Sequence, residues 1–75
     1  MLEVDWDEEL GWKNPVINPF HNLEIDPRNS TLHYAIQLFE GMKAYRNQDT
    51  ITLFRPDMNM KRLLSSAERI GLPVF

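Results

Sequence analysis

The sequence contains no cysteine, so no disulfide can stabilise the chain. Its two histidines, His21 and His33, lie far apart, and neither has an acidic partner at the close spacing of a metal motif. We therefore expect no metal site. For 75 residues, the free energy gained by apolar burial and the cost of ordering the chain are both about 110 kcal/mol. An independent fold of this chain would therefore be only marginally stable.

The sequence also lacks a surplus of basic charge, with 8 lysines and arginines against 11 acidic residues. A nucleic-acid surface would need a basic stripe, so we expect no nucleic-acid partner. No apolar run reaches the length that spans a membrane, and residues 1–5 do not resemble a secretory signal. The hydrophobic content of 43% is typical of a globular domain.

The first part of the chain alternates short extended segments with turns. Residues 2–6 alternate apolar and acidic side chains, which predicts a half-buried strand. Residues 15–20 are expected to be extended, because each proline disfavours helix in the residue before it. Residues 22–26 alternate again. The charged residues 7–11 and the segment 26–30 are predicted turns.

The middle of the chain predicts a short helix followed by a hairpin. Ser30 is a good N-cap for a helix near residues 31–38. Residues 39–46 are predicted to form a strand, residues 47–49 a turn and residues 50–54 a second strand. This spacing predicts an antiparallel hairpin.

The clearest predicted element is a long helix near residues 57–70, preceded by Pro56. Its apolar residues fall on one stripe at helical spacing. They are Met60, Leu63, Leu64, Ala67 and Ile70. Gly71 fits the position after the helix, and Pro73 prevents its continuation. The predicted fold class is α/β, more narrowly α+β, with antiparallel strands and two helices. The abrupt end after Pro73 predicts a truncated chain.

Arg62 is the most informative charged residue. At about 100° per residue it lies roughly 160° from the centre of the apolar stripe, near Met58, Ser65 and Arg69. An arginine on such a face is usually solvated. If a larger protein covers the face, the guanidinium can bind a phosphate through two parallel hydrogen bonds.

Aromatic residues gather around the predicted helix-to-strand junction. Tyr34, Phe39 and Tyr45 fit either a core or the wall of an apolar pocket, because both use the same residue types. Lys43 shares a predicted strand face with Phe39 and Tyr45, so it is a candidate pocket residue as well as an ordinary solvated lysine. No pattern in the sequence predicts a catalytic residue.

Two blocks of the chain closely resemble the branched-chain aminotransferase family. Residues 32–46 read LHYAIQLFEGMKAYR and are similar to the family pattern LHY…LFEG.KA(F/Y). Residues 53–62 read LFRPDMNMKR and resemble the family pattern LFRP..NM.R. Residues 4–23 and 66–75 continue the likeness. The resemblance therefore covers nearly the whole chain in one register.

This resemblance implies a fold-type IV enzyme that depends on pyridoxal 5′-phosphate (PLP). The family transfers the amino group of leucine, isoleucine or valine to 2-oxoglutarate, in branched-chain amino acid biosynthesis and catabolism. Its members are homodimers and occur in the cytoplasm or in mitochondria. Each subunit has a small N-terminal α/β domain and a larger domain. Residues 1–75 are expected to be part of the small domain, without the large one.

The resemblance also implies roles for five residues. Arg62 matches the arginine that binds the PLP phosphate. Phe39 and Tyr34 match residues of the substrate pocket, and the family's tyrosine serves the pocket of the partner subunit. Gly41 and Lys43 match positions near that pocket. The Schiff-base lysine has no counterpart in this chain, so we expect the chain alone to be inactive.

Two alternatives remain open. The chain can be a non-catalytic interaction fragment that docks on an intact subunit through uncovered apolar faces. It can also derive from a relative of the same fold that acts on D-amino acids or on aminodeoxychorismate. The motifs LFEGMKAY and LFRPDMNM favour the branched-chain group.

Overall fold

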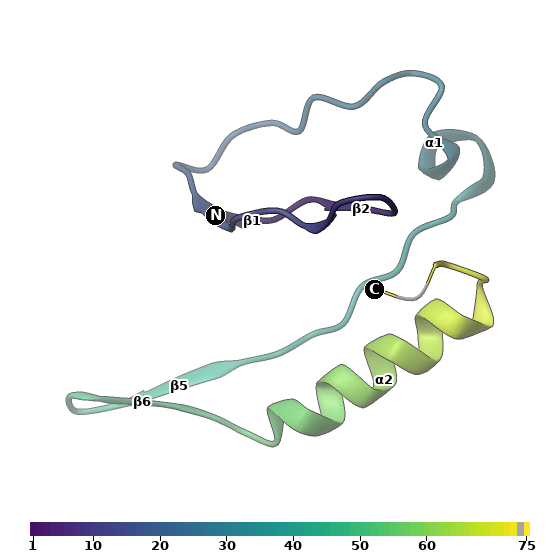
Figure 1. The fold of residues 1–75 in the computed structure, drawn as a ribbon. Coiled ribbons are helices and arrows are strands. Elements are labelled where there is room, and N and C mark those ends of the chain that lie inside the picture. The colour runs from purple at the N-terminus through teal and green to yellow at the C-terminus, as the bar shows by residue number, and fades with distance from the viewer. Residues whose placement is uncertain (74) are drawn as a thin grey trace. The chain divides into compact units, whose positions relative to one another are not determined.

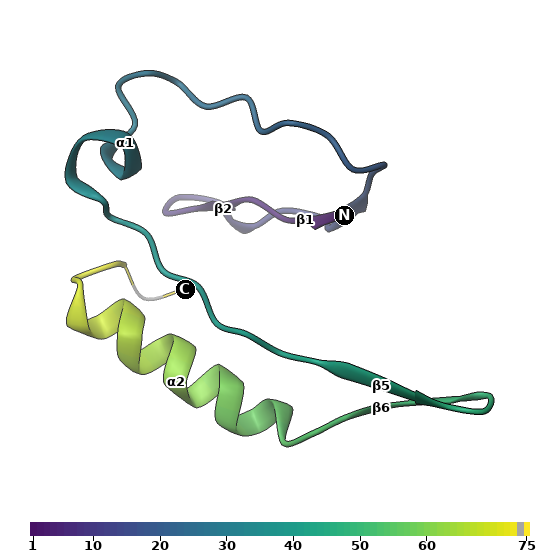
Figure 2. The same cartoon turned by 180° about the vertical axis from the view of Figure 1, so that it is seen from behind.

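The computed structural model describes residues 1–73 and 75 (Figures 1 and 2). These residues form two compact units, one from Met1–Ala35 with residues 73 and 75, the other from Ile36–Leu72. The described residues contain three two-stranded antiparallel sheets and two helices. This content confirms the predicted α+β class.

The first unit begins with two pairs of very short strands. Strand β1 (Leu2–Glu3) pairs antiparallel with β4 (Val16–Ile17), and β2 (Trp6–Asp7) pairs antiparallel with β3 (Gly11–Trp12). The strands β1 and β2 are separated, because Val4 and Asp5 lie outside both.

A charged turn joins β2 to β3, as predicted. The Asp7 carboxylate accepts hydrogen bonds from the backbone N–H groups of Glu9 and Leu10, at 2.9 and 3.1 Å. Such side-chain bonds to the backbone two or three residues ahead stabilise turns. Gly11 closes the turn with a φ of 72°, which side chains with a Cβ rarely adopt.

One strand prediction in this unit is wrong, and a second alternating segment forms no strand. Residues 2–6 do not form one half-buried strand, and both Leu2 and Val4 are exposed. Residues 22–26 have no regular structure, and both of their apolar residues are exposed. Alternation specifies a strand only where a sheet face is covered, and the described residues provide no such cover for these side chains.

Helix α1 (Ser30–Tyr34) is shorter than the predicted helix over residues 31–38. Its N-cap is Asn29 rather than Ser30, because the Asn29 side chain accepts a hydrogen bond from the Thr31 N–H at 2.8 Å. Ala35 ends the helix in a left-handed conformation with a φ of 53°. The helix therefore stops at the boundary between the two units.

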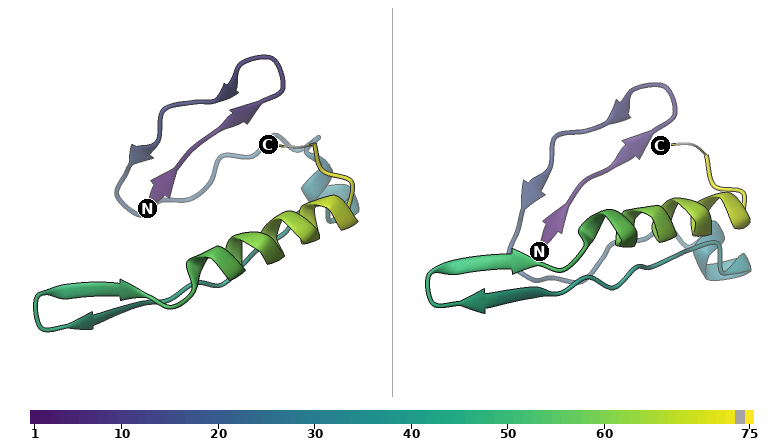
Figure 3. Two further views of the ribbon diagram at one scale, coloured as in Figure 1. Left: turned by 60° about the horizontal axis from the view of Figure 1, so that its bottom comes forward. Right: turned by 90° about the horizontal axis from the view of Figure 1, so that it is seen from below.

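The second unit contains the predicted hairpin, which leads into the long helix (Figure 3). Strands β5 (Ala44–Asn47) and β6 (Thr50–Leu53) pair antiparallel with Ala44 opposite Leu53. The predicted start of the first strand is wrong, since residues 39–43 are not in a strand. The hairpin pairing ends at Ala44 and Leu53, so residues 39–43 have no partner strand.

Helix α2 (Pro56–Arg69) begins and ends close to the predicted positions, with Pro56 in its first turn. Gly71 has a φ of 71°, and its N–H donates to the Glu68 carbonyl at 3.1 Å. The Leu72 N–H donates to the Ala67 carbonyl at 3.0 Å. This pair of bonds is a Schellman motif, the ending that the glycine predicted.

The predicted apolar stripe of α2 is only partly buried. Ala67 is 4% exposed, whereas Met60, Leu64 and Ile70 are each more than 40% exposed. The other buried residue of the helix is polar: Asn59 is 9% exposed. Asn59 lies in the first turns of the helix, on the flank of the apolar stripe.

Candidate functional site

A hollow of about 510 Å³ lies within the second unit, between the segment that precedes β5, the hairpin and the first turns of α2. Three cationic residues contribute to its lining: Lys43, Arg55 and Arg62. None of its described lining residues is acidic. Apolar side chains, including Met42 and Phe54, form much of the remaining wall. Such a hollow suits a ligand with an anionic group on an apolar body.

The structure brings three of the five predicted site residues together. Gly41, Lys43 and Arg62 all line this hollow. Phe39 belongs to the same unit, but it is not in the lining and is 92% exposed. Tyr34 lies in α1 of the first unit and is also exposed. The grouping of Phe39 and Tyr34 with the other three stays a prediction.

Arg62 is held by a carboxylate that sequence reasoning did not single out. Its Nε–H donates to Glu40 Oε2 at 3.1 Å, and its Nη2 donates to Glu40 Oε1. The Arg62 side chain is 57% exposed, whereas that of Glu40 is 15% exposed. Two parallel bonds fix the plane of the guanidinium as well as its position.

The buried amide of Asn59 supports this carboxylate. Asn59 Nδ2 donates to the Gly41 carbonyl at 2.6 Å and to Glu40 Oε1 at 3.2 Å. Asn59 and Arg62 are three residues apart on α2, so they lie on the same face of the helix. Glu40 therefore receives donors from two consecutive positions of that face.

The ion pair shifts both groups toward their charged forms. The hydrogen bond from Arg62 lowers the pKa of Glu40 below its ordinary value of 4.5; partial desolvation opposes this shift, and the Asn59 bond adds to it. The same hydrogen bond raises the pKa of Arg62. Near neutral pH the site therefore contains a carboxylate and a permanent guanidinium cation.

The donors that remain on Arg62 fit a phosphate group. An arginine has five N–H donors, and the Glu40 contact uses two of them, which leaves three. Lys43 and Arg55 add positive charge to the same hollow. The chemistry of this donor set suits an anion such as the phosphate of PLP.

Glu40 and Asn59 are the residues that sequence reasoning missed. The helical spacing of Asn59 and Arg62 was a usable signal for a shared face. Their partner, Glu40, lies before the hairpin. Its contact with α2 depends on the register of the hairpin, which residue spacing in the sequence does not give. The predicted neighbours of Arg62 are mixed, because Met58 lines the same hollow whereas Ser65 and Arg69 line another.

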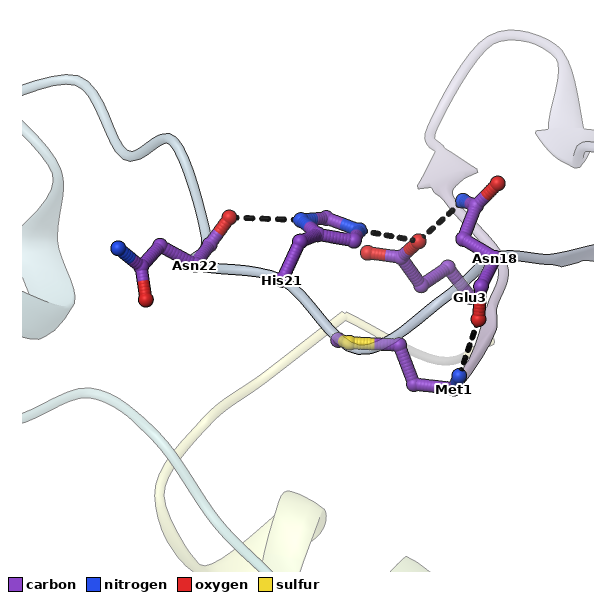
Figure 4. Close-up of polar contacts among 5 residues, drawn as sticks. All are labelled: Met1, Glu3, Asn18, His21 and Asn22. Atoms are coloured by element: carbon purple, nitrogen blue, oxygen red, sulfur yellow. Dashed lines mark hydrogen bonds and ion pairs between the residues drawn. The ribbon is translucent and has the colours of Figure 1, made fainter.

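A separate polar cluster lies in the first unit (Figure 4). His21 Nε2 lies 3.0 Å from Glu3 Oε2, and His21 Nδ1 lies 2.7 Å from the Asn22 carbonyl. Asn18 Nδ2 also donates to Glu3 Oε2, and the Met1 ammonium group donates to the Asn18 carbonyl. These contacts connect the loop after β4 with β1.

The part of the chain that the structure describes has neither a metal-binding cluster nor a membrane-spanning helix. No three His, Cys, Asp or Glu side chains there are grouped so that they could hold a metal ion. Among the same residues, neither helix combines the length and apolar character needed to cross a membrane.

Comparison with known proteins identifies close relatives. No family model matches the chain. It is 58% identical over 76 residues to the cytosolic branched-chain-amino-acid aminotransferase of Saccharomyces cerevisiae (strain ATCC 204508 / S288c) and 54% identical to the mitochondrial enzyme of that yeast. It is 57% identical to the branched-chain-amino-acid aminotransferase of Dictyostelium discoideum.

These matches include all of this chain, but only 19 or 20% of each relative. The chain thus spans about one fifth of the length of the curated relatives it matches. The relatives comprise both cytosolic and mitochondrial forms by name. On this similarity, the chain belongs to the branched-chain-amino-acid aminotransferase family and corresponds to one part of a member's length.

Proposed function

We propose that the protein carrying this chain is a PLP-dependent transaminase, which moves the amino group of leucine, isoleucine or valine to 2-oxoglutarate. The chain would form part of the small domain, and the complete protein would be a homodimer. The observation that carries the proposal is the cationic hollow of the second unit, in which Gly41, Lys43 and Arg62 meet. This unit lies in a chain 58% identical to a named branched-chain aminotransferase.

Arg62 would hold the phosphate of PLP. When bound, PLP supplies the electron sink that amino-group transfer needs, and the protein supplies orientation and charge. The guanidinium retains its cationic form and three N–H donors beyond its contact with Glu40. A fixed cation of this kind stabilises a phosphate with little rearrangement.

The substrate pocket would use the remaining predicted residues. Gly41 and Lys43 line the hollow in which the phosphate would sit, and by the family resemblance they would also lie near the substrate. Phe39 and Tyr34 present aromatic rings that are 92% and 78% exposed. Exposed rings of this size suit an apolar branched side chain as cover, and Tyr34 would serve the pocket of the partner subunit.

The chain alone would not catalyse transamination. Its three lysines are Lys13, Lys43 and Lys61, and the family resemblance assigns the Schiff-base role to none of them. The activity therefore belongs to the complete polypeptide.

Replacing Arg62 in a complete enzyme tests this proposal. The present chain can replace the matched segment of the cytosolic Saccharomyces cerevisiae enzyme, to give a chimera of full length. The chimera should transaminate leucine, and Arg62→Met should weaken PLP binding roughly tenfold to hundredfold, which is the range for lost hydrogen bonds to charged groups. Equilibrium dialysis and a coupled glutamate assay measure the two quantities.

Arg69→Met provides the matched control. Arg69 is on the same helix, but lines a different hollow with Ser65 and Glu68. This variant should retain the PLP affinity of the parent chimera. An inactive chimera, or equal effects of the two arginine substitutions, would contradict the proposed role.

A further inference from the structure

The contact between Arg62 and Glu40 uses one particular edge of the guanidinium. The two donors are Nε and Nη2, which lie side by side on that edge. A single hydrogen bond would let the planar group rotate, whereas two parallel bonds on one edge do not. The three N–H groups left on Arg62 therefore point in directions fixed by Glu40.

Glu40 is itself fixed. Its side chain is 15% exposed, and Glu40 Oε1 accepts a hydrogen bond from Asn59 Nδ2 at 3.2 Å. Asn59 is 9% exposed and also donates to the Gly41 carbonyl at 2.6 Å. The guanidinium is thus connected through Glu40 and Asn59 to the backbone of the neighbouring segment.

Glu40 does not stand between Arg62 and the hollow. Arg62 and Asn59 line the hollow, whereas Glu40 is absent from the described lining. An anion in the hollow would have Arg62 and Lys43 among the residues around it, and Glu40 is not one of the described lining residues. This arrangement differs from that of a competing carboxylate, which would occupy the space of the ligand.

We propose that Glu40, supported by Asn59, is a positioning residue that holds the free edge of Arg62 toward the hollow and so sets its affinity for a phosphate. The inference rests on the proposed phosphate contact of Arg62. An arginine without this support would lose rotational freedom only when the anion binds, and that loss weakens binding. The contact with Glu40 would restrict the rotation of Arg62 before the anion binds.

The test compares two ligands that differ only in the phosphate, PLP and pyridoxal. In the full-length chimera, Glu40→Gln should weaken PLP binding about tenfold and leave pyridoxal binding unchanged. Asn59→Ala should shift the ratio of the two affinities in the same direction by a smaller factor, because Glu40 keeps its contact with Arg62. Asn59→Ala carries the test if the Glu40 variant does not fold.

Glu68→Gln is the matched control. It also removes one negative charge, but Glu68 is on α2 and lines a different hollow. Tighter PLP binding by Glu40→Gln would identify Glu40 as a competing anion and overturn the inference. An unchanged ratio, or equal weakening of both ligands, would also overturn it. If Arg62→Met leaves the ratio of PLP affinity to pyridoxal affinity unchanged, the proposed function itself fails. If Arg62→Met lowers this ratio and Glu40→Gln does not, only the positioning role fails.

Discussion

His21 bonds an acceptor at each ring nitrogen, and this arrangement favours the imidazolium form. The Asn22 carbonyl, and then the Glu3 carboxylate, raise the pKa of His21 above its ordinary value of 6.5. The hydrogen bond from Asn18, and then that from His21, lower the pKa of Glu3 below 4.5. The pair of Glu3 and His21 is therefore charged on both sides over a defined range of pH.

His21 and Glu3 give the stability of the fold opposite dependences on pH. A raised pKa of His21 stabilises the fold below pH 6.5, and this contribution is lost as the pH rises through the raised value. A lowered pKa of Glu3 stabilises the fold above pH 4.5, and this contribution is lost as the pH falls through the lowered value. The contact is thus strongest between pH 4.5 and 6.5.

An NMR titration of the histidine ring protons in the 75-residue chain checks this prediction. The midpoint for His21 should lie above 6.5, and Glu3→Gln should lower it without a full return to 6.5, because the Asn22 carbonyl remains. A His21 midpoint that Glu3→Gln does not move would show that the carboxylate contact is absent in solution.

The position of Arg62 could be predicted from the sequence, but its partner could not. Its place opposite the apolar stripe follows from helical periodicity, and the family resemblance adds its phosphate role. The carboxylate that holds it could not be identified in the same way. Glu40 lies 22 residues away, and the hairpin register that decides their contact depends on packing rather than on local spacing.

At the scale of elements, α2 was predictable because its ends carry strong local signals. Pro56 fits the first turn of a helix, and Gly71 accepts the left-handed conformation that ends one. The strands lack comparable signals. Residues 2–6 and 39–43 have suitable patterns, but a strand needs a partner as well as a pattern, and the described neighbours do not pair with all of these residues.

Gly71→Ala tests the local signal at the end of α2. An alanine at a φ of 71° is strained by about 1 kcal/mol, so the Schellman bonds should open roughly five times more often. Hydrogen exchange of the Leu72 amide, which bonds the Ala67 carbonyl, measures this opening in the chimera. Gly41→Ala is the control, because Gly41 has no positive φ and an added Cβ would meet no atom within 4 Å. Equal exchange in the two variants would contradict the strain argument.

At the scale of the whole molecule, apolar side chains are largely uncovered. Ala67 is the one hydrophobic residue classed as buried in the described part of the chain. Phe20 and Phe39 are more than 90% exposed, and Ile17 is 84% exposed. Covering one such side chain stabilises a protein by about 1.5–3 kcal/mol. This surface fits the proposal that the chain is part of a longer polypeptide, since its relatives contain about five times its length.

The 75-residue chain and the full-length chimera should therefore differ in their exposed apolar surface. The isolated chain should bind the dye ANS with a strong rise in fluorescence, whereas the chimera at the same molar concentration should give a much smaller rise. Phe39→Ser should lower the signal of the isolated chain, because it removes one of the most exposed rings. Equal dye binding by the two parent proteins would show that the remaining polypeptide does not cover these residues.

The bonds that hold Arg62 also bear on the order in which the chain folds. They join positions 18 to 22 residues apart across a single hairpin, so only a short loop must close before they form. Contacts of such low sequence separation form early and quickly, ahead of pairings between remote segments. Once this unit folds, Arg62 would therefore be oriented for a phosphate without waiting for any pairing between remote segments of the polypeptide.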